Sequence, residues 1–229
     1  MIEIIPGKIE SAFLYFHSAG TDSREFKPFL NEIAAKMPDT YICIGDGHIS
    51  GSPVMSGSTF YGDSAEKYWF MFPMQDACSQ QSFLDNKEAM GASLLSAGSF
   101  VNNLVDQIKE KYDLSADRII LSGFQHGSSL VLASAMMRKH DPFKQVILFE
   151  PYLLEAYYLD RDSINPDTTV ICVDNHHIRS RTYNWIGVYT DAEFSKMGMK
   201  VKAITVEDGN DNLNQEMVNR ALLETGRFA

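Results

Sequence analysis

Cysteine is scarce in this chain of 229 residues, which contains three: Cys43, Cys78 and Cys172. Their number is odd and no C-x-x-C spacing joins them, so the sequence predicts neither a disulfide framework nor a zinc knuckle. Free thiols of this kind suit a reducing compartment. We therefore expect a cytoplasmic protein.

Long apolar runs are also missing. No stretch approaches the roughly 18 consecutive apolar residues that a membrane-spanning helix needs. The first ten residues, MIEIIPGKIE, carry acids and a proline where a signal peptide would have a basic start and an apolar run. The sequence thus predicts neither a membrane span nor secretion.

Basic residues are outnumbered. The chain has 20 Lys and Arg against 30 Asp and Glu, which gives a formal net charge of -10. No Lys/Arg-rich run offsets this charge locally, and a negative surface repels a phosphate backbone. Nucleic acid is therefore excluded as an expected partner.

Apolar residues, in contrast, are plentiful at 45% of the chain, enough for a substantial core. We expect one domain over residues 1–229. Short apolar runs predict six strands, at residues 11–16, 40–44, 118–122, 145–149, 169–173 and 201–206. Helical periodicity marks segments at 24–37, 100–112, 126–139, 185–197 and 213–222.

Strands and helices alternate along the chain. This order predicts an α/β fold with a mostly parallel sheet of about six to seven strands and helices on both faces. Ligands bind beyond the carboxyl ends of the strands in such sheets. Gly20, Gln125, Asn175 and Gly209 follow predicted strands, so we expect their loops to meet at one site. Residues 45–97 show little periodicity and are expected to form a long loop over that site.

The most informative stretch is residues 118–131, RIILSGFQHGSSLV. An apolar strand runs into G-F-Q-H-G and then into a helix start, which is the pattern of a nucleophile elbow. The glycines of a G-x-S-x-G elbow leave room for a strained backbone at the central residue, whose side chain stands above the sheet edge. The central residue here is Gln125, and a carboxamide cannot be deprotonated near neutral pH to give a nucleophile.

At these residues the chain resembles the phospholipase/carboxylesterase family of α/β-hydrolases, which includes the acyl-protein thioesterases. Residues 117–124, DRIILSGF, are close to the family's N-R-I-x-L-G-G-F, and residues 16–22, FHSAGTD, are similar to its L-H-G-x-G-D segment. Pro53-Val54 and Trp69-Phe70 resemble the P-V-T and S-W-F-D landmarks of the loop over the active site. The resemblance implies the α/β-hydrolase fold.

The departures from the family pattern fall on its chemistry. Gln125 stands at the serine position, Ile178 aligns with the aspartate, and Asp211 or a neighbour aligns with the histidine. No histidine follows His177. Ser18 replaces the glycine of the oxyanion-hole segment. By this alignment all three triad positions are substituted, so the family's route of acyl transfer is not expected.

Other groups offer alternatives. Ser122, Ser128 and Ser129 lie beside the elbow, but packing and helix-start hydrogen bonding account for them better than a relocated nucleophile does. His17 suits a structural hydrogen bond beneath the loop. His126 is open to two interpretations, a helix-start histidine with a structural partner or a ligand contact.

Metal binding is not predicted. Asp174, His176 and His177, with Asp46 and His48, are of ligand types but lack an H-x-x-x-H or H-E-x-x-H spacing. His176 or His177 could instead act as a base from another loop. The aromatic residues between 60 and 72 suit either an acyl channel or a satellite core.

The pocket candidates are therefore His17, Ser18, Trp69, Gln125, His126, His176 and Asp211. The favoured hypothesis is a protein without esterase activity that binds a small molecule or a protein partner, with no cofactor. The alternative is a hydrolase or lyase acting on an ester, thioester or related bond, in which a histidine with Asp211 or Asp174 activates water. A third hypothesis is an interaction protein with a collapsed pocket.

Overall fold

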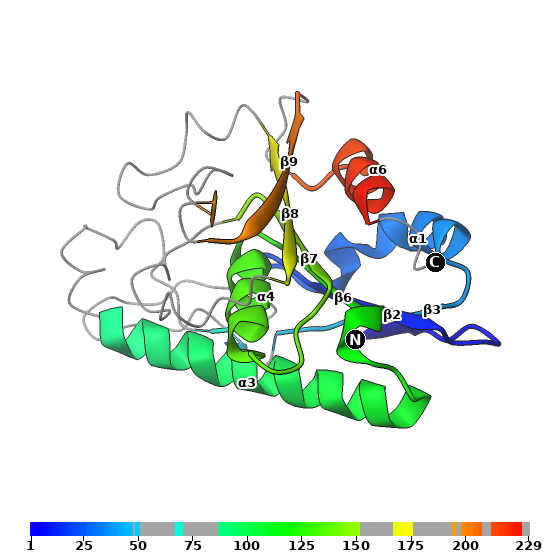
Figure 1. Cartoon of the computed structure of the whole chain (residues 1–229). Helices are drawn as coiled ribbons and strands as arrows, with labels where there is room; N and C mark the ends of the chain where they lie inside the picture. Colours follow the sequence, from blue (N-terminus) through cyan, green and yellow to red (C-terminus); the bar gives the residue numbers. More distant parts are fainter. Residues whose placement is uncertain are drawn as a thin grey trace.

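A seven-stranded sheet in the order β1-β3-β2-β6-β7-β8-β9 forms the centre of the molecule (Figure 1). The computed structural model describes residues 1–47, 49–50, 67–70, 87–151, 167–175, 194–195, 198–207 and 212–225. Every strand pair in the sheet is parallel except the edge pair of β1 with β3. The strands are β1 (Ile2–Ile4), β2 (Ser11–Phe16), β3 (Thr40–Ile44), β6 (Ile119–Phe124), β7 (Gln145–Phe149), β8 (Thr169–Asn175) and β9 (Lys200–Val206). The predicted fold class, a mostly parallel sheet of about six to seven strands, is confirmed.

The side chains of β2 show how the sheet divides the core in two. Ala12, Leu14 and Phe16 pack into one apolar cluster, and the intervening Phe13 and Tyr15 pack into the other. Successive side chains of a strand point to opposite faces, so a strand that is buried throughout must be covered on both. Helices α3 (Lys87–Tyr112) and α4 (His126–Met137) cover the first face, and α1 (Leu30–Lys36) and α6 (Gln215–Glu224) cover the second (Figure 1).

The prediction of an irregular region over residues 45–97 was wrong at its end. Helix α3 begins at Lys87 and runs for 26 residues. The segment is rich in Gly, Ser and Ala, which suggested a loop, but these small residues let α3 approach α4 closely. A Cβ on Gly98 would lie 3.1 Å from Sδ of Met137. Two short strands, β4 (Ile49–Ser50) and β5 (Lys67–Tyr68), also pair within the expected loop.

Other boundaries differ more modestly. The segment predicted as a helix from residue 24 begins with two 3-10 turns, Ser23–Glu25 and Lys27–Phe29, and only Leu30–Lys36 is α-helical. Pro28 explains this, because proline donates no backbone hydrogen bond and restricts the residue before it. Strand β6 covers Ile119–Phe124, where residues 118–122 were predicted. Strand β8 extends to Asn175, β9 begins at Lys200, α4 ends at Met137, and the edge strand β1 was not predicted.

Of the helix predicted over residues 185–197, only Phe194 and Ser195 fall within the described residues, and both are helical. None of the helices that the structure describes combines the length and apolar character needed to cross a bilayer.

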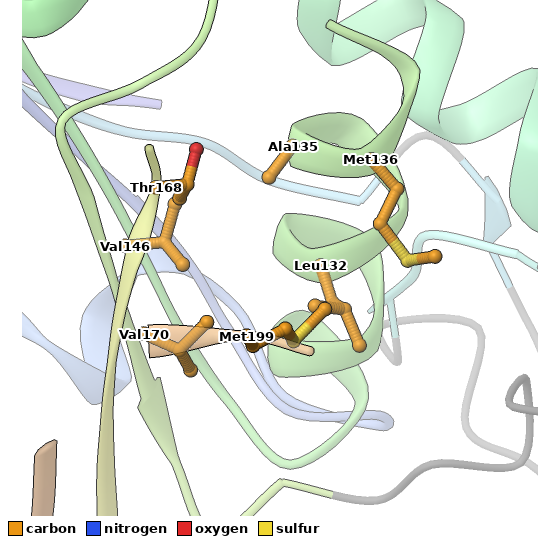
Figure 2. Close-up of a pocket in the computed structure, with 7 residues that line it drawn as sticks. All are labelled: Leu132, Ala135, Met136, Val146, Thr168, Val170 and Met199. Atoms are coloured by element: carbon orange, nitrogen blue, oxygen red, sulfur yellow. The ribbon is translucent and has the colours of Figure 1, made fainter. Parts of the chain in front are cut away.

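A small apolar hollow lies between α4 and the first residues of β7 and β8 (Figure 2). Leu132 and Ala135 of α4 face Val146 and Val170 of the strands, with Met199 between them. Its volume of about 10 Å³ is close to that of one water-sized sphere. It lies at the end of α4 far from Gln125, so it is a packing feature of the core.

Candidate functional site

The elbow predicted from the sequence is present. Strand β6 ends at Phe124, α4 begins at His126, and Gln125 between them has φ of 50° and ψ of −106°. Few residues other than glycine adopt a positive φ, which costs about 1–3 kcal/mol. Gln125 therefore holds the strained backbone conformation of a nucleophile elbow without being a nucleophile.

Two glycines make this turn possible. A Cβ on Gly123 would lie 2.3 Å from the carbonyl carbon of Gly127. A Cβ on Gly127 would lie 2.0 Å from the backbone oxygen of Phe16. Both contacts are far inside van der Waals distance and involve backbone, so the elbow can close on β2 only with glycine at both positions.

The carboxyl edge of the sheet continues from Gln125 to the next two strands. Gln125 N donates to the backbone oxygen of Phe149, and Glu150 N donates to that of Val173, each at 2.8 Å. Glu150 also has a positive φ, 47°, and is 4% exposed. Its neighbour across the sheet, Asp174, is equally buried. Gln125, Glu150 and Asp174 therefore form a row of polar residues along this edge, in which Gln125 is partly exposed and the two acids are buried.

The side chain of Gln125 is held from both sides. Its Oε1 accepts a hydrogen bond from Oγ of Ser18 at 2.8 Å, and its Nε2 donates to Oε2 of Glu150 at 3.2 Å. Because a carboxylate only accepts, the amide nitrogen must face Glu150 and the amide oxygen must face Ser18. The contacts fix which way the carboxamide points.

Ser18 is itself anchored by a partly buried acid, Glu25. Oε2 of Glu25 accepts from the backbone N of Ser18 at 3.0 Å, from Oγ1 of Thr21 at 3.1 Å and from the hydroxyl of Tyr15 at 3.2 Å. Burial raises the pKa of Glu25 above its ordinary value, although these hydrogen bonds act in the opposite direction. The loop after β2 is thereby tied to the start of the following helical turns.

His17 is fully buried, and both of its ring nitrogens are engaged. Nε2 accepts from the backbone N of Gly47 at 2.9 Å, so the proton lies on Nδ1, which donates to the backbone oxygen of Ser18 at 2.6 Å. Burial lowers the pKa of His17. The ring is a structural link between two loops and is not placed to take up a proton.

His126 points into the core. It is 2% exposed and its ring stacks on Phe70 with the centroids 3.8 Å apart. Burial, and to a smaller extent the nearby His17, lower the pKa of His126 to about 3. Of its two interpretations, the structure supports a packed histidine at a helix start.

The remaining candidates among the described residues are also structural. Trp69 is 1% exposed and its Nε1 donates to the backbone oxygen of His17 at 3.1 Å. Ser122 donates to the backbone oxygen of Leu14, and Ser128 contacts the backbone oxygens of Gly123 and Phe149. Buried hydroxyls that are satisfied by backbone oxygens are not positioned as nucleophiles.

Several predicted positions lie outside the described residues: His48, His176, His177, Ile178, Gly209 and Asp211. Asn175, expected just past a strand, is the last residue of β8. Four loops were expected to meet at one site. The structure brings two of these segments together, the loop after β2 and the elbow, through the hydrogen bond of Ser18 to Gln125.

Two residues of the candidate site were missed from the sequence, Glu150 and Glu25, which bond to Gln125 and Ser18. A signal existed for Glu150, because it directly follows the buried strand QVILF and precedes a proline, which places it at the carboxyl edge. Glu25 lies in a segment predicted as an amphipathic helix, where an acid is expected on the solvent side. Nothing in the pattern pointed to its partial burial or to its bond with Ser18.

Metal-binding side chains do not gather in groups of three or more His, Cys, Asp or Glu anywhere in the described part of the chain. A wider groove of about 820 Å³ lies between α1 and α6, lined in part by Ser11 and Thr40, the first residues of β2 and β3. It opens at the amino edge of the sheet, opposite the elbow.

No protein-family model matches the chain, and no curated protein does either. Solved structures do. The crystal structure of esterase PE8 has a TM-score of 0.73 at 14% identity, covering 98% of this chain and 96% of that one. The crystal structure of SOBER1 from Arabidopsis thaliana has a TM-score of 0.68 at 11% identity, covering 93% of this chain and 96% of that one. The structure of YahD with malic acid has a TM-score of 0.65 at 18% identity, covering 98% of this chain and 96% of that one. At these identities the likeness concerns the fold, and the chain has the α/β-hydrolase fold of carboxylesterases over almost its whole length.

Proposed function

We propose that this chain is a non-hydrolytic protein of the α/β-hydrolase fold that binds a small molecule or a protein partner at its elbow. The observation that carries the proposal is the carboxamide of Gln125, held between Ser18 and Glu150 where a nucleophile would stand. A carboxamide has no proton that a neighbouring base can remove near neutral pH. It can still donate and accept hydrogen bonds.

The departures from the family pattern support this proposal because two of them bond to each other. Ser18 replaces the family's glycine and Gln125 its serine, and their side chains meet at 2.8 Å. A glycine at position 18 would leave Oε1 of Gln125 without this partner. The two substitutions thus form one polar contact that suits a retained and ordered site.

The alternative, a hydrolase that activates water, receives less support. It needs a base within hydrogen-bond reach of the reaction centre. His17 uses both ring nitrogens in structural bonds, and the low pKa of His126, about 3, makes it a weak base. A base from His176, His177 or Asp211 would have to come from outside the described residues.

The descriptions of two structural neighbours refer to small molecules. PE8 is described as an esterase, and YahD was determined with malic acid. Neither activity nor ligand transfers at such low identity. What supports the proposal is that the same fold keeps its elbow here with a side chain suited to binding.

The test is an assay of the native protein with p-nitrophenyl acetate and a short-chain acyl thioester, together with labelling by a fluorophosphonate. We expect no turnover above buffer and no labelling. The Gln125→Ser variant should stay silent as well, since neither His17 nor His126 is available to activate the new hydroxyl.

A native rate that disappears in Gln125→Ala, in His126→Gln or in His176→Ala would overturn the proposal. Circular dichroism of each variant shows whether the fold is retained, so a lost rate can be assigned to chemistry. Fluorophosphonate labelling of the native chain would point to a relocated serine instead.

A further inference from the structure

The side-chain amide of Gln125 can form more hydrogen bonds than the two that it makes to Ser18 and Glu150. A glutamine side chain has two N–H donors and two oxygen lone pairs. One N–H goes to Glu150 and one lone pair to Ser18. Within the part of the chain that the structure describes, no other group bonds to this carboxamide, and Gln125 is partly exposed. One donor and one acceptor on adjoining atoms therefore remain.

The orientation of these two groups is fixed. If the amide were turned over, its oxygen would face the carboxylate of Glu150, and two acceptors would then meet at about 3 Å. The hydroxyl of Ser18 could accommodate either orientation, but it points to Oε1 once Nε2 is bound by Glu150. The order of the donor and the acceptor is therefore set before any ligand arrives.

The positions of both partners are fixed as well. The backbone N–H of Ser18 donates to the partly buried Glu25, and the backbone N–H groups of Gln125 and Glu150 donate to the adjoining strands. A side chain that is already ordered loses little conformational freedom on binding, so less of the binding free energy is lost to ordering it. The site is thus preorganised for one pattern of hydrogen bonds.

We propose that Gln125 recognises a neutral carboxamide group on the ligand, with Ser18 and Glu150 as its positioning residues. This inference rests on the proposed binding function. The carbonyl oxygen of the ligand accepts the open N–H of Gln125, and the ligand N–H donates to the open lone pair of Oε1. No covalent step is involved.

Carboxylates and esters pair less well than an amide with the open N–H and the open lone pair of Gln125. A carboxylate has acceptors only, so one of its oxygens would face the lone pair of Oε1. An ester has an acceptor for the N–H but no donor for Oε1. A donor or acceptor of Gln125 that faces a ligand atom unable to pair with it gives up its bond to water without gaining another, which weakens binding. The expected order of affinity is therefore amide, then ester, then carboxylate.

The experiment titrates the native protein with hexanamide, methyl hexanoate and hexanoate, which share one acyl chain. Binding is followed by the ¹H–¹⁵N signals of the Gln125 side chain. We expect hexanamide to bind about tenfold more tightly than hexanoate, as one hydrogen bond made or lost implies. Gln125→Met keeps the chain length without hydrogen bonding and should remove this preference, measured by competition or calorimetry. Ser18→Ala should reduce it several-fold while the protein stays folded.

Three results would overturn the inference: equal affinity for hexanoate and hexanamide, an unchanged preference in Gln125→Met, or no response of the Gln125 signals to any of the three probes. The proposed function fails by a different readout, which is release of methanol from methyl hexanoate. A protein that hydrolyses the ester contradicts the proposed function, whereas one that leaves it intact but does not prefer the amide contradicts the carboxamide inference alone.

Discussion

The residues of the elbow show that this turn holds a strained backbone with a glutamine at its centre. Gln125 keeps a positive φ although no nucleophile is presented there. The strain, about 1–3 kcal/mol, has to be offset by surrounding contacts. Those contacts are visible: the backbone bond to Phe149, and the side-chain bonds to Ser18 and Glu150.

The first prediction at this scale concerns Gly127. An alanine there would place Cβ 2.0 Å from the backbone oxygen of Phe16, so β2 or the elbow must shift. We expect Gly127→Ala to lower the free energy of unfolding by about 3 kcal/mol, at the upper end of what overpacking costs. Urea unfolding measures this as a fall in midpoint at unchanged m-value.

Gly7→Ala is the matched control. Gly7 is exposed and a Cβ there would meet nothing within 4 Å. The same substitution should change stability by less than about 0.5 kcal/mol. A Gly127→Ala protein as stable as Gly7→Ala would show that the elbow does not press against β2 as described.

At the scale of elements, the contact between α3 and α4 includes a polar pair in which Ser134 is buried and Asn102 is partly buried. Nδ2 of Asn102 donates to the backbone oxygen of Ser134 at 3.1 Å, and Oγ of Ser134 donates to Oδ1 of Asn102 at 2.9 Å. Ser134 is fully buried. This reciprocal bond fixes the position of the long helix over α4, whose first residue follows the elbow.

We predict that Asn102→Asp destabilises the protein by about 2 kcal/mol near neutral pH, because the new carboxylate faces the backbone oxygen of Ser134 without a proton to donate. The deficit should shrink in acid, where a protonated carboxyl can donate. Asn103→Asp introduces the same charge on an exposed position one residue away and should have little effect. Equal thermal unfolding of the two variants would contradict a hydrogen-bonded role for Asn102.

The elements also show where the sequence was sufficient. The strands β2, β3 and β7 were predicted with their observed bounds, because a strand buried on both faces leaves an uninterrupted apolar run between turn residues. The start of α3 was missed although Met90, Leu94, Ala97 and Val101 are buried at helical spacing. The Gly and Ser residues that separate these apolar positions favour a loop when the local sequence is considered alone. In the fold they suit a helix, because α4 packs closely against them.

The candidate site was predicted in part, for a related reason. The elbow is encoded locally in one strand, one turn and one helix start, so residues 118–131 were enough to place Gln125. The contact of Gln125 with Ser18 joins residues 107 positions apart, and its contact with Glu150 joins residues 25 apart. Such pairs depend on strand order and register, which local patterns do not specify.

On the scale of the whole molecule, the fold buries two histidines in a chain whose formal net charge is -10. His17 and His126 are both buried, and burial lowers the pKa of each. A histidine that is harder to protonate in the folded state than in the unfolded chain makes folding dependent on pH. The acid limb of the stability curve should therefore report on the surroundings of the elbow.

The sign follows from proton binding. Between the usual histidine pKa of about 6.5 and the folded pKa of His126, about 3, the unfolded chain holds one more proton at this site than the folded protein. The free energy of unfolding then rises with pH. This contribution is complete above about pH 6.5 and is lost as the pH falls, by up to about 1.4 kcal/mol per pH unit for one site.

We predict that His126→Gln, which introduces the residue found at this position in the family that the chain resembles, flattens the slope of stability against pH between about pH 6 and pH 4.5 by close to one proton. His140→Gln, which removes an exposed histidine, is the matched control. Urea unfolding of the three proteins across this range measures the difference, and parallel curves for His126→Gln and the native chain would mean that the ring is protonated as readily in the folded state as in the unfolded one.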